Sequence, residues 1–499
     1  MTAAEFDGSI RDLVDRRADG APDHIFLIDP DSGETTTFAE LADRCRFVAG
    51  QAGAQGVKPG EAVGYAMVNG TDTATVILGL LYGGYLATAI NLVAGRQTID
   101  YVLADSGAKL VFCHEHTRDL LGDSPPCRTL VVAGEMAGTG RQPSATRPAA
   151  SDPGLLMYTS GTTGTPKGVL LTHQNLIAGG TNTAIAHELT PQDRGLCVLP
   201  LYHINGLCVT LIGALVSGSG LILPQRFSVG KFWDQLRRHR GTWFSVVPTQ
   251  ISYLLNEAAA NGHDPKDLDQ LRFGRSASAP LSPDVQRTFE AQFNVPVIET
   301  MGLTETAAQI LSNPMHGTRK IGSPGIAFGN EVIIADAEHK ELPRGEEGEV
   351  LVRGRNIMLG YLNNPDATRA ALAPGGWLRT GDLGRMDPQG YVTITGRLKE
   401  LIIKGGENIA PREVDEALYS HPDVIEAAAF GRSCDQYGQR VEAAVRLRDG
   451  TTVQPADLIN LCRDKLGAFK APDRLHVLPE LPKGPSGKIQ RARLSDLTE

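Results

Sequence analysis

A stretch rich in glycine and hydroxyl side chains, residues 158–168, has the composition of a phosphate-binding loop and reads YTSGTTGTPKG. Its glycines let the backbone turn where a side chain would clash, and its hydroxyl groups and Lys167 offer hydrogen-bond donors and positive charge to phosphate oxygens. It is not a Walker loop, because Lys167 is followed by Gly168 instead of the Ser or Thr that binds magnesium there. The same composition is also typical of an ordinary surface loop.

The segments that flank this stretch favour the phosphate-binding interpretation. The apolar runs 155–157 and 168–171 have the pattern of two strands of one hairpin. A rigid hairpin holds its turn in a fixed place, so a glycine-rich turn at this position can bind a triphosphate.

The stretch resembles the phosphate loop of the adenylate-forming enzymes, the superfamily of acyl-CoA synthetases, firefly luciferase and nonribosomal adenylation domains. Further motifs of that superfamily follow in its usual order, so the resemblance covers nearly the whole chain. For this loop it implies a set of nucleotide-binding residues: Thr159, Ser160, Gly161, Thr162, Thr163, Gly164 and Lys167.

A second motif, ETMGLTE at 299–305, follows a strand-like segment at 295–298. Ligands of open α/β sheets collect at the carboxyl ends of strands, so the position suits a nucleotide. The resemblance implies that Thr304 binds the α-phosphate and that Glu305, with Thr159, holds Mg²⁺ between protein and phosphate oxygens. Alone, a Thr-Glu pair is more typical of the first turn of a helix.

The residues before this pair are expected to contact the base of the nucleotide. The resemblance assigns Thr300, Met301 and Gly302 to the nucleotide site, with Met301 where the superfamily usually has Tyr or Phe stacked on adenine. A polarizable thioether can still cover the ring, so we expect weaker or less selective nucleotide contact without loss of function.

A turn of small residues, RSASAPL at 275–281, resembles the turn that contacts adenine and lines the acyl slot. Ser278, Ala279 and Pro280 are its predicted nucleotide contacts, and the ordinary alternative is a turn into a helix that starts near 282–283. Arg275 could meet a second carboxylate on the substrate, or it could be solvated or face a phosphate.

His203 lies between an apolar segment and a glycine turn in the sequence LPLYHINGL. A lone His in such surroundings is more often a core residue. In the superfamily the matching aromatic residue or His stands at the mouth of the acyl pocket, so we predict that His203 is a gate and not a base.

The motif GWLRTGD supplies Asp382, which resembles the carboxylate that binds both ribose hydroxyls; an acceptor-only group suits a diol. On its own, Thr-Gly-Asp is typical of a turn. The resemblance further implies that Arg397 reaches the ribose, that Lys399 is the hinge of a small mobile domain, and that Gly405 and Gly406 face the pantetheine tunnel.

The segment LPKGPSGKI near the C-terminus carries Lys488, our candidate for the adenylation lysine. Attack of a carboxylate on the α-phosphorus brings negative groups together, and an ammonium group can bridge them in the transition state. A lysine in such a loop is otherwise simply solvated.

The chain has 499 residues, which is too long for one hydrophobic core. Helical patterns such as 38–49 alternate with strand patterns at 62–68 and 109–113, which predicts parallel sheets covered by helices. Together with the resemblance, this predicts an α/β fold with a β-barrel-like subdomain in a large domain (1–398) and a small mobile α+β domain (399–499). A surface linker is expected at 133–152.

The net charge of −9 argues against a nucleic-acid partner. Two long uncharged stretches, 73–95 and 196–224, are broken by glycine and are expected in the core, with no integral membrane segment. The seven cysteines form no Cys-x-x-Cys pair, which is typical of reduced thiols and predicts a cytoplasmic protein without a zinc site.

These observations predict an ATP-dependent ligase that joins a small to medium carboxylic acid to coenzyme A through an acyl-adenylate, as a monomer or homodimer. The alternatives are an enzyme that loads an acyl carrier protein, a ligase for oxalate or another small diacid, an amino-acid adenylating domain and a non-catalytic nucleotide sensor. The diacid alternative rests on a local likeness of 275–281 and 312–314 to oxalate–CoA ligases.

Overall fold

The computed structural model describes residues 6–122, 125–132, 146–159, 165–261, 268–484 and 489–498. The glycine-rich part of the predicted phosphate loop, 160–164, and Lys488 lie outside these residues. Most of the predicted linker at 133–152 does too.

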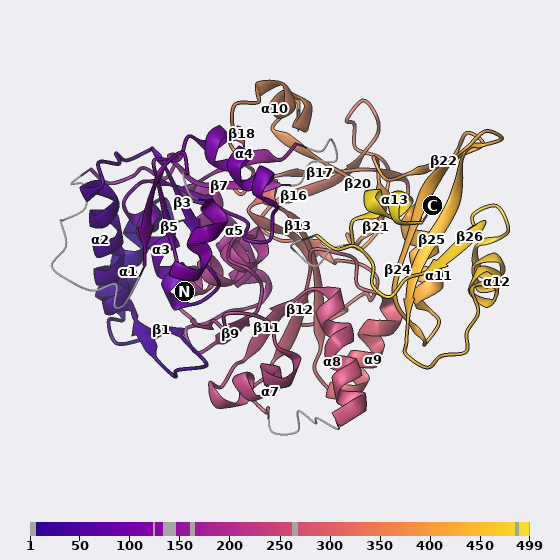
Figure 1. Cartoon of the computed structure of the whole chain (residues 1–499), viewed down its shortest axis with the longest axis horizontal. Coiled ribbons are helices and arrows are strands. Elements are labelled where there is room, and N and C mark those ends of the chain that lie inside the picture. Colours follow the sequence, from indigo (N-terminus) through magenta and orange to yellow (C-terminus); the bar gives the residue numbers. More distant parts are fainter. Residues whose placement is uncertain are drawn as a thin grey trace.

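The first large sheet has nine strands, and its pairs from β13 to β1 are parallel (Figure 1). Its order is β15 (Ile326–Ala327), β14 (Ala308–Ser312), β13 (Val297–Leu303), β12 (Phe273–Ser276), β11 (Trp243–Val246), β9 (Arg194–Cys197), β10 (Gly220–Ile222), β1 (Ile25–Ile28) and β2 (Thr35–Thr37).

The second large sheet has seven strands and is parallel from β7 to β6. Its order is β18 (Gly360–Tyr361), β8 (Lys167–Thr172), β7 (Pro153–Thr159), β4 (Leu86–Ala89), β3 (Ala62–Ala66), β5 (Leu110–Cys113) and β6 (Arg128–Val131). β7 and β8 pair antiparallel from end to end, with Thr159 opposite Lys167. The predicted hairpin around the phosphate loop is therefore confirmed.

Two smaller sheets follow along the chain. The first is antiparallel and contains β16 (Glu331–Ala335), β17 (Glu347–Arg353), β20 (Trp377–Met386), β19 (Leu372–Ala373) and β21 (Val392–Arg397). It is an open sheet, so the subdomain expected to be barrel-like does not close into a barrel.

The last sheet belongs to a separate C-terminal domain, at the right of Figure 1. Its strands are β23 (Glu407–Ile409), β22 (Ile402–Lys404), β25 (Gly438–Leu447), β24 (Val424–Cys434) and β26 (Arg474–Val477), and its helices are α11 (Pro411–Tyr419), α12 (Pro455–Leu466), η4 (Arg491–Arg493) and α13 (Leu494–Leu497). The boundary at 398/399 itself stays a prediction.

The helices before the C-terminal domain mostly cover the two large sheets. They are α1 (Ile10–Gly20), α2 (Phe38–Ala54), α3 (Thr71–Tyr82), α4 (Arg96–Ser106), η1 (Glu115–Leu121), α5 (His173–Ala186), η2 (Asn205–Ile212), α6 (Gly213–Ser217), α7 (Val229–Arg238), α8 (Pro248–Asn261), α9 (Pro283–Phe293), η3 (Thr304–Thr306) and α10 (Pro365–Ala371). α9 begins directly after Ser282, as the sequence predicted.

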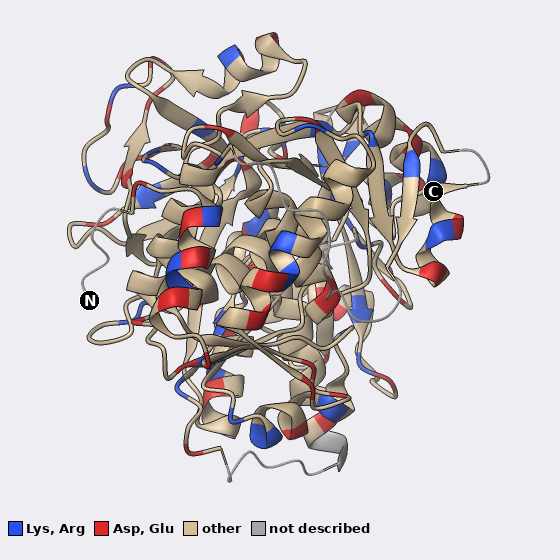
Figure 2. Ribbon diagram, turned by 90° about the vertical axis from the view of Figure 1, so that its left-hand side faces the viewer, with Lys and Arg blue, Asp and Glu red and all other residues tan. Residues whose placement is uncertain are grey.

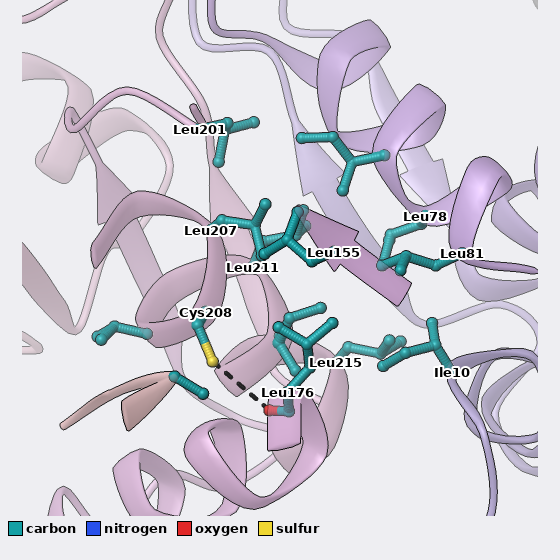
Figure 3. Packing of buried hydrophobic residues seen from close by; sticks show 14 of the residues in the cluster. Ile10, Leu78, Leu81, Leu155, Leu176, Leu201, Leu207, Cys208, Leu211 and Leu215 are labelled. Atoms are coloured by element: carbon teal, nitrogen blue, oxygen red, sulfur yellow. Dashed lines mark hydrogen bonds between the residues drawn. The ribbon is translucent and has the colours of Figure 1, made fainter. Parts of the chain in front are cut away.

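The largest core cluster lies between the two large sheets and includes residues of α1, α2, α3, α5, η2 and α6. Figure 3 shows part of it, where leucines of α3 and η2 pack around Leu155 and the thiol of Cys208 donates to the carbonyl oxygen of Leu176 at 3.5 Å. Because side chains alternate along a strand, Trp243 joins this cluster whereas Phe244 joins a second one under α7, α8 and α9.

The two long uncharged stretches contribute to these clusters. The segment 73–95 contains most of α3 and all of β4, and 196–224 contains η2, α6 and β10, with most of their side chains buried. No helix in the described part of the chain combines the length and the hydropathy that a membrane span requires. On the face shown in Figure 2, Lys and Arg alternate with Asp and Glu along the helices.

A buried histidine fixes α1 against α5. The amide of Ile10 donates to Nδ1 of His173 at 3.3 Å, and Nε2 of His173 has no hydrogen-bond partner among the described residues. Burial lowers the pKa of His173 to about 4 from its ordinary value of 6.5.

This shift predicts a loss of stability in acid. The unfolded chain binds the proton near pH 6.5 and the folded chain only near pH 4, so the stabilisation is complete above pH 6.5 and is lost as the pH falls toward 4. We expect thermal midpoints to fall over this range, with a contribution from His173 on the order of 3 kcal/mol. In the His173→Gln variant the thermal midpoint should depend less on pH than in the unaltered chain. The matched change at the exposed His316 should leave the pH dependence of the midpoint as it is. Equal slopes for His173→Gln and the unaltered chain would contradict the assignment.

Candidate active site

A cavity of about 200 Å³ lies where the carboxyl ends of β11, β12 and β13 meet β21 and the C-terminal domain. Parallel strands end at the same edge of a sheet, which brings residues far apart in sequence to one place. The lining comes from the segments after β11 and β12, from β13, β20 and β21, from α11 and from residues near the C-terminus; it includes Thr249, Ser278, Met301, Asp382, Arg397 and Arg491.

Asp382 and Arg397 form an ion pair in the wall of this cavity. They lie opposite each other on β20 and β21, and Nε of Arg397 donates to Oδ1 of Asp382 at 2.8 Å. Burial lowers the pKa of Arg397, but Asp382 and then Glu400 outweigh it, so the pKa is raised overall. Both predicted ribose contacts thus face one space, with the arginine fully charged.

The predicted base contacts line the same cavity. Thr300, Met301 and Gly302 line it from β13, and the turn after β12 contributes Ser278 together with Ala279 and Pro280. A Cβ atom at Gly302 would lie 1.8 Å from the carbonyl oxygen of Ala308, so only glycine lets β13 and β14 approach here. Ser278 has a φ of 73°, a strained conformation of the kind that gathers at ligand sites.

Two of the predicted metal and phosphate residues, Glu305 and Lys167, meet at Tyr361. The hydroxyl of Tyr361 donates to Oε1 of Glu305 at 2.8 Å, and Nζ of Lys167 lies 5.2 Å from the centre of the tyrosine ring. Thr304 is the first residue of η3 and Thr159 is the last residue of β7. Glu305 contributes to raising the pKa of Arg397, so its carboxylate lies within electrostatic reach of the Asp382–Arg397 pair.

Alternating charges connect this pair to the end of the chain. Nη1 of Arg397 lies 3.9 Å from Oε1 of Glu400, and Oε2 of Glu400 lies 3.3 Å from Nε of Arg491. Arg491 also pairs with Asp415. Sequence reasoning missed Arg491 and Asp415, although Arg491 stands three residues after Lys488 in the last motif. Ile489 lines the cavity, so the residue next to Lys488 in the chain is at the site.

Two hydrogen bonds fix the C-terminal domain against α8. Nζ of Lys483 donates to the hydroxyl of Tyr253 at 3.4 Å, and Nη1 of Arg448 donates to Oδ1 of Asn256 at 3.2 Å.

Eight predicted site residues in the described part of the chain lie outside the cavity lining: Thr159, Lys167, Thr304 and Glu305, described above, and His203, Lys399, Gly405 and Gly406. His203 stands just before η2 and packs its ring against Tyr202, with 4.9 Å between ring centres. Lys399 is exposed in the turn between β21 and β22. Gly405 and Gly406 form the exposed turn between β22 and β23, where φ values of 61° and 85° favour glycine.

Arg275 is buried, so the prediction that it could be solvated is wrong. Only 2% of the residue is exposed, and its Nη1 donates to Oδ1 of Asn205 at 2.7 Å and to Oγ of Ser245 at 3.2 Å. Its Nε donates to Oε1 of Gln309 at 3.4 Å, and Gln309 also contacts the ring of His187. No sequence motif pointed to these partners.

The chain matches two family models. Residues 14–362 match the AMP-binding enzyme model, and residues 413–488 match the model of the AMP-binding enzyme C-terminal domain. The match to the first covers more than half of the chain. This protein therefore belongs to the AMP-binding enzyme family.

Similar proteins of known name are carboxylate–CoA ligases. A sulfoacetate–CoA ligase of Cupriavidus necator (strain H16) is 46% identical over 99% of this chain and 98% of its own. An oxalate–CoA ligase of Arabidopsis thaliana is 36% identical over 87% of this chain and 88% of its own.

A solved structure shows the same fold. The crystal structure of ATP-bound MatB from Rhodopseudomonas palustris is 30% identical, covers 98% of both chains and gives a TM-score of 0.90, whereas the apo structure of MatB gives 0.80. Within its family this chain is an acid–thiol ligase that uses ATP, a carboxylic acid and CoA.

The buried ion pair gives a first test of the site. We expect Asp382→Ala to raise the KM for ATP at least tenfold, because a hydrogen bond to a charged group contributes about 1.5–3 kcal/mol and the ribose would lose two. Steady-state pyrophosphate release at varied ATP measures this, with Glu347→Ala on the same sheet as the control. An unchanged KM would show that Asp382 does not hold the ribose.

Proposed function

We propose that this ligase activates a short carboxylic acid at the cavity described above, with the ribose of ATP on Asp382 and Arg397 and the phosphates toward Lys167 and Glu305. The observation that carries the proposal is the Asp382–Arg397 pair in the cavity wall. Ile489, next to Lys488 in the chain, lines the same cavity, and Glu305, which accepts from Tyr361, lies within electrostatic reach of Arg397.

In the first half-reaction an oxygen of the substrate carboxylate attacks the α-phosphorus of ATP. The bond from that phosphorus to the bridging oxygen breaks, and the products are an acyl-adenylate and pyrophosphate. Positioning and neutralisation of charge are the main tasks of the protein in such a transfer. We assign Lys488 and Thr304 to the α-phosphate, with Thr159, 160–164 and Lys167 on the remaining phosphates.

In the second half-reaction the sulfur of CoA attacks the acyl carbonyl carbon, the bond to AMP breaks, and the thiol proton passes to water. For this step the C-terminal domain turns about Lys399, which withdraws Lys488 and brings Gly405 and Gly406 to the pantetheine path, while His203 gates the acyl pocket. The higher TM-score with ATP-bound MatB supports the view that the present arrangement is the one for the first step.

Magnesium is expected with the nucleotide. The carboxylate of Glu305 and the hydroxyl of Thr159 supply the hard oxygen ligands that Mg²⁺ prefers, and Mg²⁺ of this kind takes its remaining ligands from phosphates and water. Among the described residues no group of three or more His, Cys, Asp or Glu could hold a metal. The ion would neutralise charge on the leaving pyrophosphate.

Two of the relatives support a short acid with a second acidic group. The ligases of Cupriavidus necator and Arabidopsis thaliana are named for sulfoacetate and oxalate, which are acids of this kind. CoA is the acceptor in both names, so CoA is the acceptor that we propose here ahead of a carrier protein. A cytoplasmic location and a monomer or homodimer remain predictions of the sequence.

Replacement of Lys488 should impair the first half-reaction and leave the second one largely intact. We expect Lys488→Ala to lose acid-dependent pyrophosphate release by at least a hundredfold, because the mobile ammonium group stabilises the transition state of the first step. The same variant supplied with chemically made acyl-adenylate should still form the thioester. The exposed Lys465→Ala serves as the control. Normal adenylation with failed thioester formation would refute the assignment.

A substrate screen tests the function as a whole. Pyrophosphate release with Mg-ATP is measured for sulfoacetate, oxalate, malonate, short and medium fatty acids, benzoates and amino acids, with and without CoA. We expect turnover that depends on CoA for one class of short acid. Thioester formation only on a carrier protein would favour the carrier-loading alternative, and the absence of release with every acid would overturn the proposed function.

A further inference from the structure

Arg275 is a buried charge without a countercharge. It lies at the end of β12 with 2% of its surface exposed, and it is among the largest fully buried side chains. Its three hydrogen-bond acceptors are neutral: Asn205, Ser245 and Gln309. In the described part of the chain no carboxylate pairs with it. The cluster formed by these four residues is called the Arg275 cluster below.

A charge in this position opposes folding. An ion removed from water without an opposite charge raises the free energy of the folded state, so buried charges are normally paired. The two arginines that line the cavity and are only partly buried do have such partners, because Arg397 pairs with Asp382 and Arg491 pairs with Asp415. Burial lowers the pKa of Arg275 to about 9, so the guanidinium is still charged at neutral pH.

The Arg275 cluster contains N–H donors that have no acceptor among the described residues. Within the part of the chain that the structure describes, the hydrogen bonds of Arg275 use only Nε and Nη1, and Nε2 of Gln309, which is fully buried, has no partner. His187, which contacts Gln309, is held neutral because burial and then Arg275 lower its pKa well below the ordinary value. Positive charge and spare N–H groups beside a neutral ring are what an anion requires.

The Arg275 cluster adjoins the cavity. Asn205 accepts from Arg275 through Oδ1 and donates through Nδ2 to Oγ of Ser278 at 3.2 Å, and Ser278 lines the cavity. Arg275 therefore stands one side chain behind the wall at which the acid is adenylated. A short acid whose reacting carboxylate lies in the cavity would carry its far end toward this cluster.

We propose that Arg275 recognises a second anionic group on the substrate, a carboxylate or a sulfonate, and so restricts the enzyme to short acids with two acidic groups. Nη2 of Arg275 and Nε2 of Gln309 are the donors available to that group. A planar guanidinium suits both anions because it offers parallel N–H donors. This inference rests on the proposed function and adds the class of its substrate.

The test compares acids with and without the second anion. In the unaltered enzyme kcat/KM for sulfoacetate, oxalate or malonate should exceed that for acetate and propionate. Arg275→Met should lower kcat/KM for the preferred acid at least a hundredfold, change that for propionate less than threefold and leave the KM for ATP unchanged. Arg275→Lys should restore part of the preference, and the exposed Arg287→Met is the control.

A second variant keeps the test decisive if Arg275→Met does not fold. Gln309→Glu has nearly the same shape and places a carboxylate beside Arg275, which should abolish the preference for a second anion while the side chain of Arg275 stays packed. Equal losses for all acids in these variants, or no preference in the unaltered enzyme, would overturn the inference. If the unaltered enzyme turned over none of these acids, the proposed function itself would be refuted. Preference for sulfoacetate over oxalate, or the reverse, identifies which anion the cluster binds.

Discussion

The shared edge at which β11, β12 and β13 end is the constraint on which the rest of the site depends. Parallel pairing aligns the carboxyl ends of these strands, so the segments that follow them converge although they are far apart in the chain. The strained turn at Ser278 and the glycine contact at Gly302 both occur at this edge. The two core clusters on either face of the sheet hold that edge rigid, which lets strained backbone persist there.

Charge pairing joins this rigid edge to the C-terminal domain. The series Asp382, Arg397, Glu400, Arg491 and Asp415 alternates in sign through both parts of the site. Because the signs alternate, each of these side chains has a group of opposite charge beside it in the series. The contacts from Lys483 and Arg448 to α8 are polar and partly exposed, as is typical of interfaces between domains that can move relative to one another.

Arg275 stands apart from this series because its neighbours are neutral. The unpaired charge of Arg275 raises the free energy of the folded free enzyme, whereas Arg397 has Asp382 as its partner. On our proposal, an anionic group of the substrate pairs with Arg275 and lowers that free energy. Part of the binding energy is then available only to an acid with a second negative group. Selectivity of this kind resides at the far end of the substrate, away from the carboxylate that reacts.

The sequence by itself determined the family, the order of its motifs and several local elements. The hairpin of β7 and β8 and the start of α9 after Ser282 were predictable, because turns, caps and apolar alternation depend on neighbours a few residues away. Only the tertiary structure decided that Tyr361 donates to Glu305, that Arg491 is connected through Glu400 to Arg397 and that Arg275 is buried without a carboxylate. These facts depend on strand register and on which face of a sheet a side chain occupies, and both are fixed by packing between segments that are distant in the chain.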